Sequence, residues 1–268
     1  MSSPVTPATT EPVVLREEQG GVVRLTLNRP RQLNSLSRAM IDQLQQELDA
    51  IGADHSARVV VIAGAGNNFC AGHDLKEMRA MNDRAALLGL FRDCSRMMLT
   101  LRRIPQPVIA RVQGIATAAG CQLVAMCDLV VASDTARFAV SGINVGLFCS
   151  TPGVALSRAV GRKPALEMLF TGEFIDAAAA ERRGLVNRVV PAERLDDEVA
   201  GLAAAIVAKS PAAIASGKRL FYEQADLGIE AAYERAADVM AADMLAPDAA
   251  EGIDAFLAKR PPRWRGIP

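Results

Sequence analysis

Two segments of the chain place small residues directly after an apolar run, where a bound molecule could approach the main chain closely. The first covers residues 68–78 (NFCAGHDLKEM), and the second covers residues 107–128, which include Ala118, Ala119 and Gly120. The second segment also opens a predicted helix, whose first N–H groups lack partners inside the helix and lie at the positive end of its dipole. One free amide from each turn could therefore meet the same oxygen atom. Such an oxyanion hole is worth about 3–4 kcal/mol per donor.

These small residues also have a purely structural explanation, because close packing in any α/β fold favours them after strands. Gly64 and Gly66 form only a fragment of a phosphate loop, without the third glycine or the spacing to a helix, so no dinucleotide site is expected. The chain has two histidines, His55 and His73, and five cysteines without a CxxC spacing. This composition predicts neither a metal site nor a disulfide framework, and it indicates a reducing, cytoplasmic compartment.

Length and charge narrow the classes of protein to which the chain can belong. Its 268 residues, half of them hydrophobic, suffice for one sizeable core. Lysine and arginine total 30, as do aspartate and glutamate, so neither a nucleic acid nor a membrane is expected as a partner. No apolar run approaches the roughly 18 residues that span a bilayer. Residues 1–12 are rich in Ser, Thr and Pro without Arg or Lys, and they predict a disordered tail rather than a signal or transit peptide.

The elements that would position these two segments alternate between strand and helix. A hairpin is predicted around Gly20 and Gly21, and Ser37 is a candidate N-cap for an amphipathic helix. Strands are predicted at residues 13–16, 22–27, 59–63, 108–112, 129–132, 137–140 and 186–190, and helices at 83–103, 118–127, 191–209, 211–224, 229–245 and 249–259. This alternation predicts an α/β fold, with a core over residues 13–200 and a C-terminal helical region over residues 201–268. The helical region would pack on the core or on a neighbouring subunit.

Several short motifs, spread over nearly the whole chain after the first twelve residues, resemble those of the crotonase family, the enoyl-CoA hydratases and isomerases. They are TLNRP at 26–30 with Leu33 and Asn34, FCAGHDL at 69–75, the whole of 107–128, RAVG at 158–161, LFTG at 169–172 and GLVNRVV at 184–190. The combination is specific. The resemblance implies a spiral of ββα units with a C-terminal helical trimerisation region, assembled as a homotrimer or a dimer of trimers.

The resemblance also implies a ligand, an acyl-CoA thioester whose coenzyme A is part of the substrate, with no separate cofactor and no metal. The two oxyanion donors of the family fall on the backbone N–H groups of His73 and Ala119. The positions that line the family's CoA pocket correspond to Arg31, Leu33, Ala71, Asp74, Leu75 and Lys76. For Arg31 and Lys76 the alternative is a solvated surface charge. For Asp74 it is a cap on the following helix, which is the interpretation we favour.

The chain departs from the family where proton transfer takes place. Hydratases of the family use two glutamates, and these positions fall on Gln122 and Gly142. A glutamine amide can hydrogen-bond a water molecule but cannot accept its proton, and glycine offers only its backbone. General acid–base help contributes roughly 10²–10⁴-fold per group. We therefore expect an acyl-CoA-binding protein with an intact oxyanion hole and weak or absent hydration of 2-enoyl-CoA.

Two other functions stay open on the sequence. A CoA thioester hydrolase or isomerase could use Cys149, Ser150 or His73, although a thiol reacts only when its pKa is lowered. Thr151 and Pro152 also suit the N-cap and first position of a helix, which is the structural explanation for this turn and the one we favour. The third function is a non-catalytic acyl-CoA sensor or scaffold.

Overall fold

The fold begins with an antiparallel hairpin, and the computed structural model describes it together with the rest of residues 11–265. Strand β1 (Val14–Gln19) pairs with β2 (Val22–Leu27) from Val14 opposite Leu27 to Gln19 opposite Val22. Gly20 and Gly21 make the turn with φ of 59° and 81°, the left-handed conformation that a tight hairpin requires. The predicted hairpin is confirmed. The predicted tail, residues 1–12, lies outside the described residues except for its last two.

A six-stranded sheet continues from this hairpin and is parallel from β2 onward. Its order is β1-β2-β3-β4-β6-β9, where the added strands are β3 (Val59–Gly64), β4 (Val108–Val112), β6 (Leu129–Ser133) and β9 (Arg188–Val190). Every residue of β3 is buried, as expected for a strand covered on both faces. A smaller sheet joins β5 (Ile115–Thr117), β7 (Arg137–Ala139) and β8 (Ile175–Asp176). The α/β class is confirmed.

All seven predicted helices are present, and residues 11–265 contain four further α-helices for which no range was predicted, α2, α5, α6 and α7. The structure has η1 (Pro30–Gln32), α1 (Arg38–Gly52), α2 (Leu75–Ala80), α3 (Arg84–Arg103), α4 (Ala119–Met126), η2 (Ser141–Val145), α5 (Ser150–Ala159), α6 (Arg162–Thr171), α7 (Ala177–Arg182), η3 (Ala192–Arg194), α8 (Leu195–Val207), α9 (Pro211–Gln224), α10 (Ile229–Met244) and α11 (Pro247–Leu257). Ser37 caps α1 as predicted, because its side chain accepts a hydrogen bond of 3.2 Å from the backbone N–H of Met40.

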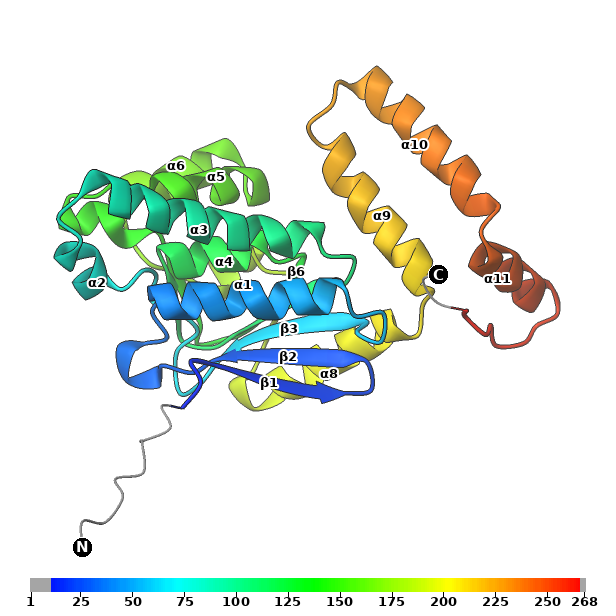
Figure 1. The fold of residues 1–268 in the computed structure, drawn as a ribbon, viewed down its shortest axis with the longest axis horizontal. Coiled ribbons are helices and arrows are strands. Elements are labelled where there is room, and N and C mark those ends of the chain that lie inside the picture. Colours follow the sequence, from blue (N-terminus) through cyan, green and yellow to red (C-terminus); the bar gives the residue numbers. More distant parts are fainter. Residues whose placement is uncertain (1–10, 266–268) are drawn as a thin grey trace, which may run out of the picture.

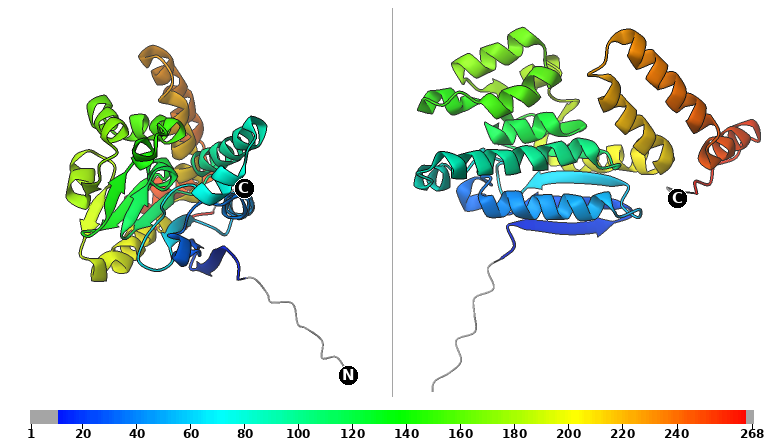
Figure 2. Two further views of the ribbon diagram at one scale, coloured as in Figure 1. Left: turned by 90° about the vertical axis from the view of Figure 1, so that its left-hand side faces the viewer. Right: turned by 45° about the horizontal axis from the view of Figure 1, so that its top comes forward.

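Helices cover both faces of the large sheet, as the ribbon views show (Figures 1 and 2). Alternate residues of a strand point to opposite faces, and the two buried clusters follow this rule. Val60, Ile62 and their neighbours pack with α1, α3 and α4, whereas Val59 and Val61 pack with α8. The expected boundary near residue 200 falls inside α8, and the division of the chain into a core and a helical region stays a prediction.

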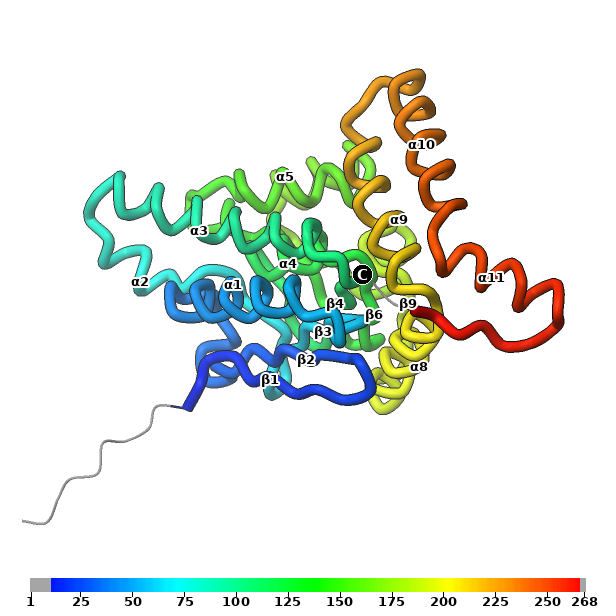
Figure 3. The backbone as a smooth tube through the Cα atoms, turned by 45° about the vertical axis from the view of Figure 1, so that its right-hand side comes forward, coloured from blue at the N-terminus to red at the C-terminus, as the bar shows by residue number. Residues whose placement is uncertain are grey.

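Helices α9, α10 and α11 form an arm that stands away from the sheet and its covering helices (Figures 1 and 3). Its first helix is held to the body by a cluster around Asp128. Lys218, whose side chain is only 7% exposed, pairs with Asp128 at 2.7 Å, and Tyr222 donates to the same carboxylate at 2.6 Å. Lys218 also donates to the carbonyl oxygens of Leu101 and Gln106 at 2.7 and 2.8 Å.

We expect Asp128→Ala to destabilise the protein by about 3–5 kcal/mol, because it leaves a buried ammonium without its counter-ion. Urea unfolding followed by circular dichroism measures this change. The control is Glu223→Ala in the same arm, which breaks an exposed pair with Arg235 and should cost less than about 1 kcal/mol. Equal losses in the two variants would show that the cluster does not anchor the arm.

Candidate functional site

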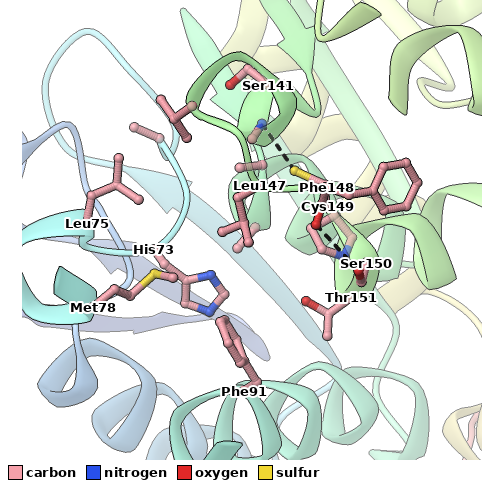
Figure 4. A pocket seen from close by; sticks show the side chains of 16 residues that line it. His73, Leu75, Met78, Phe91, Ser141, Leu147, Phe148, Cys149, Ser150 and Thr151 are labelled. Carbon is pink, nitrogen blue, oxygen red and sulfur yellow. Dashed lines mark hydrogen bonds between the residues drawn. The ribbon is translucent and has the colours of Figure 1, made fainter. Parts of the chain in front are cut away.

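A cavity of about 360 Å³ lies where the two small-residue segments meet the end of η2 and the start of α5. This volume is within the range of small-molecule sites. Its walls come from six parts of the fold: Ala71, His73, Leu75, Met78, Phe91, Ala118, Ala119, Ser141, Gly142, Val145, Leu147, Phe148, Cys149, Ser150, Thr151 and Pro152 (Figure 4). Among these residues there is no Asp, Glu, Lys or Arg, so within the described chain the cavity is lined by apolar and neutral polar groups.

The two segments touch through their main chains at Gly72. This residue has φ 92°, and a Cβ atom built on it would lie 3.1 Å from the backbone nitrogen of Ala119 and 2.8 Å from Cβ of Ala118. Ala118 itself has φ 51° and ψ −120°, a conformation that is rare and strained for a residue with a side chain. The backbone of one turn is therefore pressed against the first residue of α4.

The N–H groups of His73 and Ala119 are the amides of interest in this contact. Within residues 11–265 no hydrogen bond has either of them as its donor, whereas their neighbours are paired: Asp74 donates to Leu36 at 3.2 Å and Ala118 to Ala139 at 3.0 Å. A buried N–H without a partner is rare, although the first residue of a helix always lacks an internal acceptor. Both residues line the same cavity. Their role as oxyanion donors stays a prediction.

The imidazole of His73 lines the cavity and packs edge-to-face on Phe91, with ring centroids 5.4 Å apart. Its Nε2 atom is buried and has no hydrogen-bond partner among the described residues. Burial lowers the pKa of His73 to about 4. The ring is therefore uncharged at neutral pH, and it adds no positive charge to the cavity.

The two positions that the family resemblance assigns to glutamates have different surroundings. Gln122 is 5% exposed, and its Oε1 atom has no partner among the described residues. It lies in α4 but is not part of the cavity wall. Gly142 does line the cavity, but a Cβ there would lie 2.5 Å from the carbonyl oxygen of Leu147 and 2.8 Å from Sγ of Cys149. No side chain fits at position 142 unless the following loop moves.

Neither candidate nucleophile forms a hydrogen bond with a base among the described residues. Sγ of Cys149 accepts a hydrogen bond from the backbone N–H of Gly142 at 3.3 Å, and burial raises the pKa of this thiol. The hydroxyl of Ser150 donates to the carbonyl oxygen of Phe148 at 3.4 Å. The predicted cap at Thr151 is wrong. Helix α5 begins at Ser150, because the carbonyl oxygen of Cys149 already accepts from the N–H of Gly153 at 2.8 Å.

The residues expected in a CoA pocket divide into two groups. Ala71 and Leu75 line the cavity, whereas Arg31, Leu33 and Lys76 are exposed outside it.

Asp74 caps α2, as favoured, by accepting from the N–H groups of Lys76 and Glu77 at 3.1 and 3.3 Å. It also pairs with Arg29 at 3.1 Å. Burial opposes ionisation of Asp74, but the Arg29 guanidinium and the two amides outweigh burial and lower the pKa of this carboxyl.

Several residues of the cavity wall were not among the predicted site residues. Phe91 comes from the middle of α3, which would pass for an ordinary apolar helix face, and Ser141 follows a three-residue strand. Ser141 shares a hydrogen bond of 2.8 Å with Thr117. Phe91 is one of only eight phenylalanines in the chain, and this rarity is the one signal that could have drawn attention to α3.

Within residues 11–265, no group of three or more His, Cys, Asp or Glu side chains is arranged to hold a metal ion. In the same residues no single helix is long and apolar enough to cross a membrane, although one bent pair of helices, Ala192–Val207 with Pro211–Gln224, has the length and composition when taken together.

Known proteins resemble this chain over almost its whole length. The profile of the family described as enoyl-CoA hydratase/isomerase matches residues 17–267. The mitochondrial enoyl-CoA hydratase domain-containing protein 3 of Xenopus laevis is 46% identical over 94% of this chain and 86% of its own. An enoyl-CoA hydratase structure from Mycobacterium smegmatis superposes with a TM-score of 0.93 at 58% identity, covering 95% of this chain and 99% of that one. The structure of human enoyl-CoA hydratase domain-containing protein 3 superposes with a TM-score of 0.92 at 44% identity, covering 94% of this chain and 100% of that one.

These relatives correct one expectation, the cytoplasmic location. The Xenopus, rat and human proteins are all named as mitochondrial, so the cytoplasmic assignment is wrong. The reason lies in the inference from cysteine. Five free thiols indicate a reducing compartment, but they do not say which one.

The pKa of His73 predicts how stability depends on pH. At pH values between the ordinary histidine pKa of 6.5 and the folded pKa of about 4, His73 binds a proton in the unfolded chain but not in the folded chain. The contribution of His73 to the free energy of unfolding is therefore constant above about pH 6.5. It falls by on the order of 1–3 kcal/mol as the pH drops below that value. In His73→Gln this part of the loss should vanish when urea unfolding at pH 7 and pH 5 is compared. A pH profile of His73→Gln identical to that of the wild type would contradict the assignment.

Proposed function

Because the chain belongs to the enoyl-CoA hydratase/isomerase family, we propose that its cavity binds an acyl-CoA thioester whose carbonyl oxygen accepts from the N–H groups of His73 and Ala119. Enzymes of this family act on CoA thioesters and need no separate cofactor. The observation that carries the proposal is the pair of amides without acceptors on the wall of one cavity. Ala71 and Leu75 would contact the thioester end of CoA, and the exposed Arg31, Leu33 and Lys76 its outer part.

Two amide dipoles in an apolar cavity would polarise the thioester carbonyl strongly. Electrostatic interactions are worth more in a low-dielectric site than in water, and donors that are already in place need no rearrangement when charge develops. The partial negative charge of an enolate would be stabilised by dipoles alone, since the wall carries no cationic side chain. The site therefore suits the binding and polarisation of an acyl group.

We further propose that hydration of 2-enoyl-CoA is weak or absent. Gln122 and Gly142 cannot transfer protons, and the space for a side chain at position 142 is taken. A thioester hydrolase would need an activated nucleophile. The raised pKa of Cys149 and the absence of a hydrogen bond between Ser150 and a base in the described chain speak against it. A non-catalytic acyl-CoA sensor remains the outcome if no conversion is found.

The assembly that we propose is a homotrimer or a dimer of trimers. The arm presents large apolar side chains to solvent, including Leu245 at 88% exposed and Phe256 at 82% exposed. Large apolar side chains exposed in the same part of a protein are typical of an interface. An arm that stands away from its own body is suited to pack on a neighbouring copy.

The carbonyl contact can be tested from the ligand side. We expect an alkyl-CoA thioether, which lacks the carbonyl oxygen, to bind about 10- to 100-fold more weakly than the acyl-CoA of equal length, because two hydrogen bonds are lost. Isothermal titration calorimetry measures both affinities while the CoA portion stays constant. Equal affinities would mean that the two amides do not hold the oxygen, and the absence of any acyl-CoA binding would refute the function itself.

The hydration proposal predicts a turnover of 2-enoyl-CoA at least about 10²-fold below that of a hydratase with both carboxylates. Gln122→Glu alone should not restore it, because the second proton-transfer group is still missing. Loss of the enoyl absorbance measures the rate. Rapid hydration by the wild-type protein would be the contrary result.

Adding the second carboxylate should cost stability instead of restoring activity. Gly142→Glu forces the loop that follows it outward and should lower stability by about 1–3 kcal/mol. Gly89→Glu in α3 is the matched control, since a Cβ at Gly89 meets nothing within 4 Å. Equal thermal stability of the two variants would show that position 142 is open after all.

A further inference from the structure

The loop between η2 and α5 folds back onto Gly142 and forms hydrogen bonds with both the carbonyl oxygen and the N–H of that residue. The N–H of Leu147 donates to the carbonyl oxygen of Gly142 at 3.0 Å. The N–H of Gly142 donates in turn to Sγ of Cys149 at 3.3 Å (Figure 4). Residues 142–149 therefore form a closed loop whose two ends meet at the cavity wall.

The sulfur of Cys149 and the carbonyl oxygen of Leu147 together occupy the space that a side chain at position 142 would need. A Cβ on Gly142 would lie 2.8 Å from this sulfur, which is closer than real Cβ contacts. Cys149 is 7% exposed, and of the five cysteines it is the one that lines the cavity. Its thiol is thus the wall of the cavity next to Gly142.

We propose that Cys149 determines the substrate class by closing the cavity beside Gly142, so that the site selects acyl groups without a branch next to the thioester. The inference rests on the proposed function, because it requires the carbonyl to lie on the amides of His73 and Ala119. The α-carbon is one bond from that carbonyl, and Gly142 and Cys149 line the same cavity of about 360 Å³ as His73 and Ala119.

The chemistry of the thiol suits this role better than a reactive one. A buried cysteine behaves as a small hydrophobic side chain with a weak acceptor, and the acceptor is already used by the N–H of Gly142. Burial raises the pKa of Cys149, so the sulfur stays protonated and uncharged. The wall therefore presents an apolar surface of fixed position, since the loop that carries it is tied at both ends.

Two substitutions of Cys149 move the wall in opposite directions. Cys149→Ala removes the sulfur and opens room for about one methyl group, while Cys149→Val adds volume. The measured quantity is the ratio of affinities for 2-methylbutyryl-CoA and butyryl-CoA, obtained by titration calorimetry. We expect Cys149→Ala to raise this ratio about fourfold, the effect of burying one additional methyl group, and Cys149→Val to lower it.

The matched control is Cys127→Ala, which removes a buried sulfur at the end of α4 that does not line the cavity. It should leave the ratio unchanged. A ratio that is unaffected by both Cys149 substitutions, or changed equally by Cys127→Ala, would overturn the inference while leaving acyl-CoA binding intact. If the wild-type protein binds neither thioester, the proposed function fails and the inference fails with it. If Cys149→Ala does not fold, Cys149→Val is sufficient as the test. An affinity ratio in Cys149→Val that is not lower than in the wild type would contradict the proposal.

Discussion

The close approach of the two small-residue segments is the constraint on which the cavity depends. Main-chain atoms lie where side chains would be: a Cβ on Gly120 would lie 2.1 Å from the carbonyl oxygen of Cys70, and a Cβ on Gly114 would lie 2.0 Å from that of Asn67. Gly72 meets the start of α4 in the same way. Packing and ligand binding are therefore not competing explanations for these small residues. The contacts that lock the segments together also bring His73 and Ala119, whose N–H groups have no acceptor within residues 11–265, to the wall of one cavity.

The side chains that line the resulting cavity carry no net charge at neutral pH. The two ionisable groups on its wall are His73 and Cys149, and burial keeps the first unprotonated and the second protonated at neutral pH. Backbone dipoles are then the main electrostatic feature of this cavity. This distinguishes the cavity from a site built for proton transfer, where carboxylates have their pKa values set near the working pH.

Local patterns predicted most of the fold. The glycine pair of the hairpin, the Ser37 cap and the buried run of β3 each depend on neighbouring residues, and each is confirmed. Features that depend on distant contacts could not be predicted. The contact of Phe91 with His73 and the packing of Cys149 against Gly142 join separate elements or turns, and strand β5 is too short to show a period. Small residues after two predicted strands indicated a pair of free amides, and only the family resemblance assigned these amides to His73 and Ala119.

Helix α4 joins two parts of the molecule that otherwise look independent. Its first residue, Ala119, is at the cavity, and Asp128, two residues past its end, holds the base of the arm through Lys218 and Tyr222. Eight residues of α-helix form a stiff rod roughly 12 Å long. The arm is thus attached next to the C-terminal end of α4, whose N-terminal end carries the N–H of Ala119. A second subunit packed against the arm would act on the end of α4 opposite the cavity.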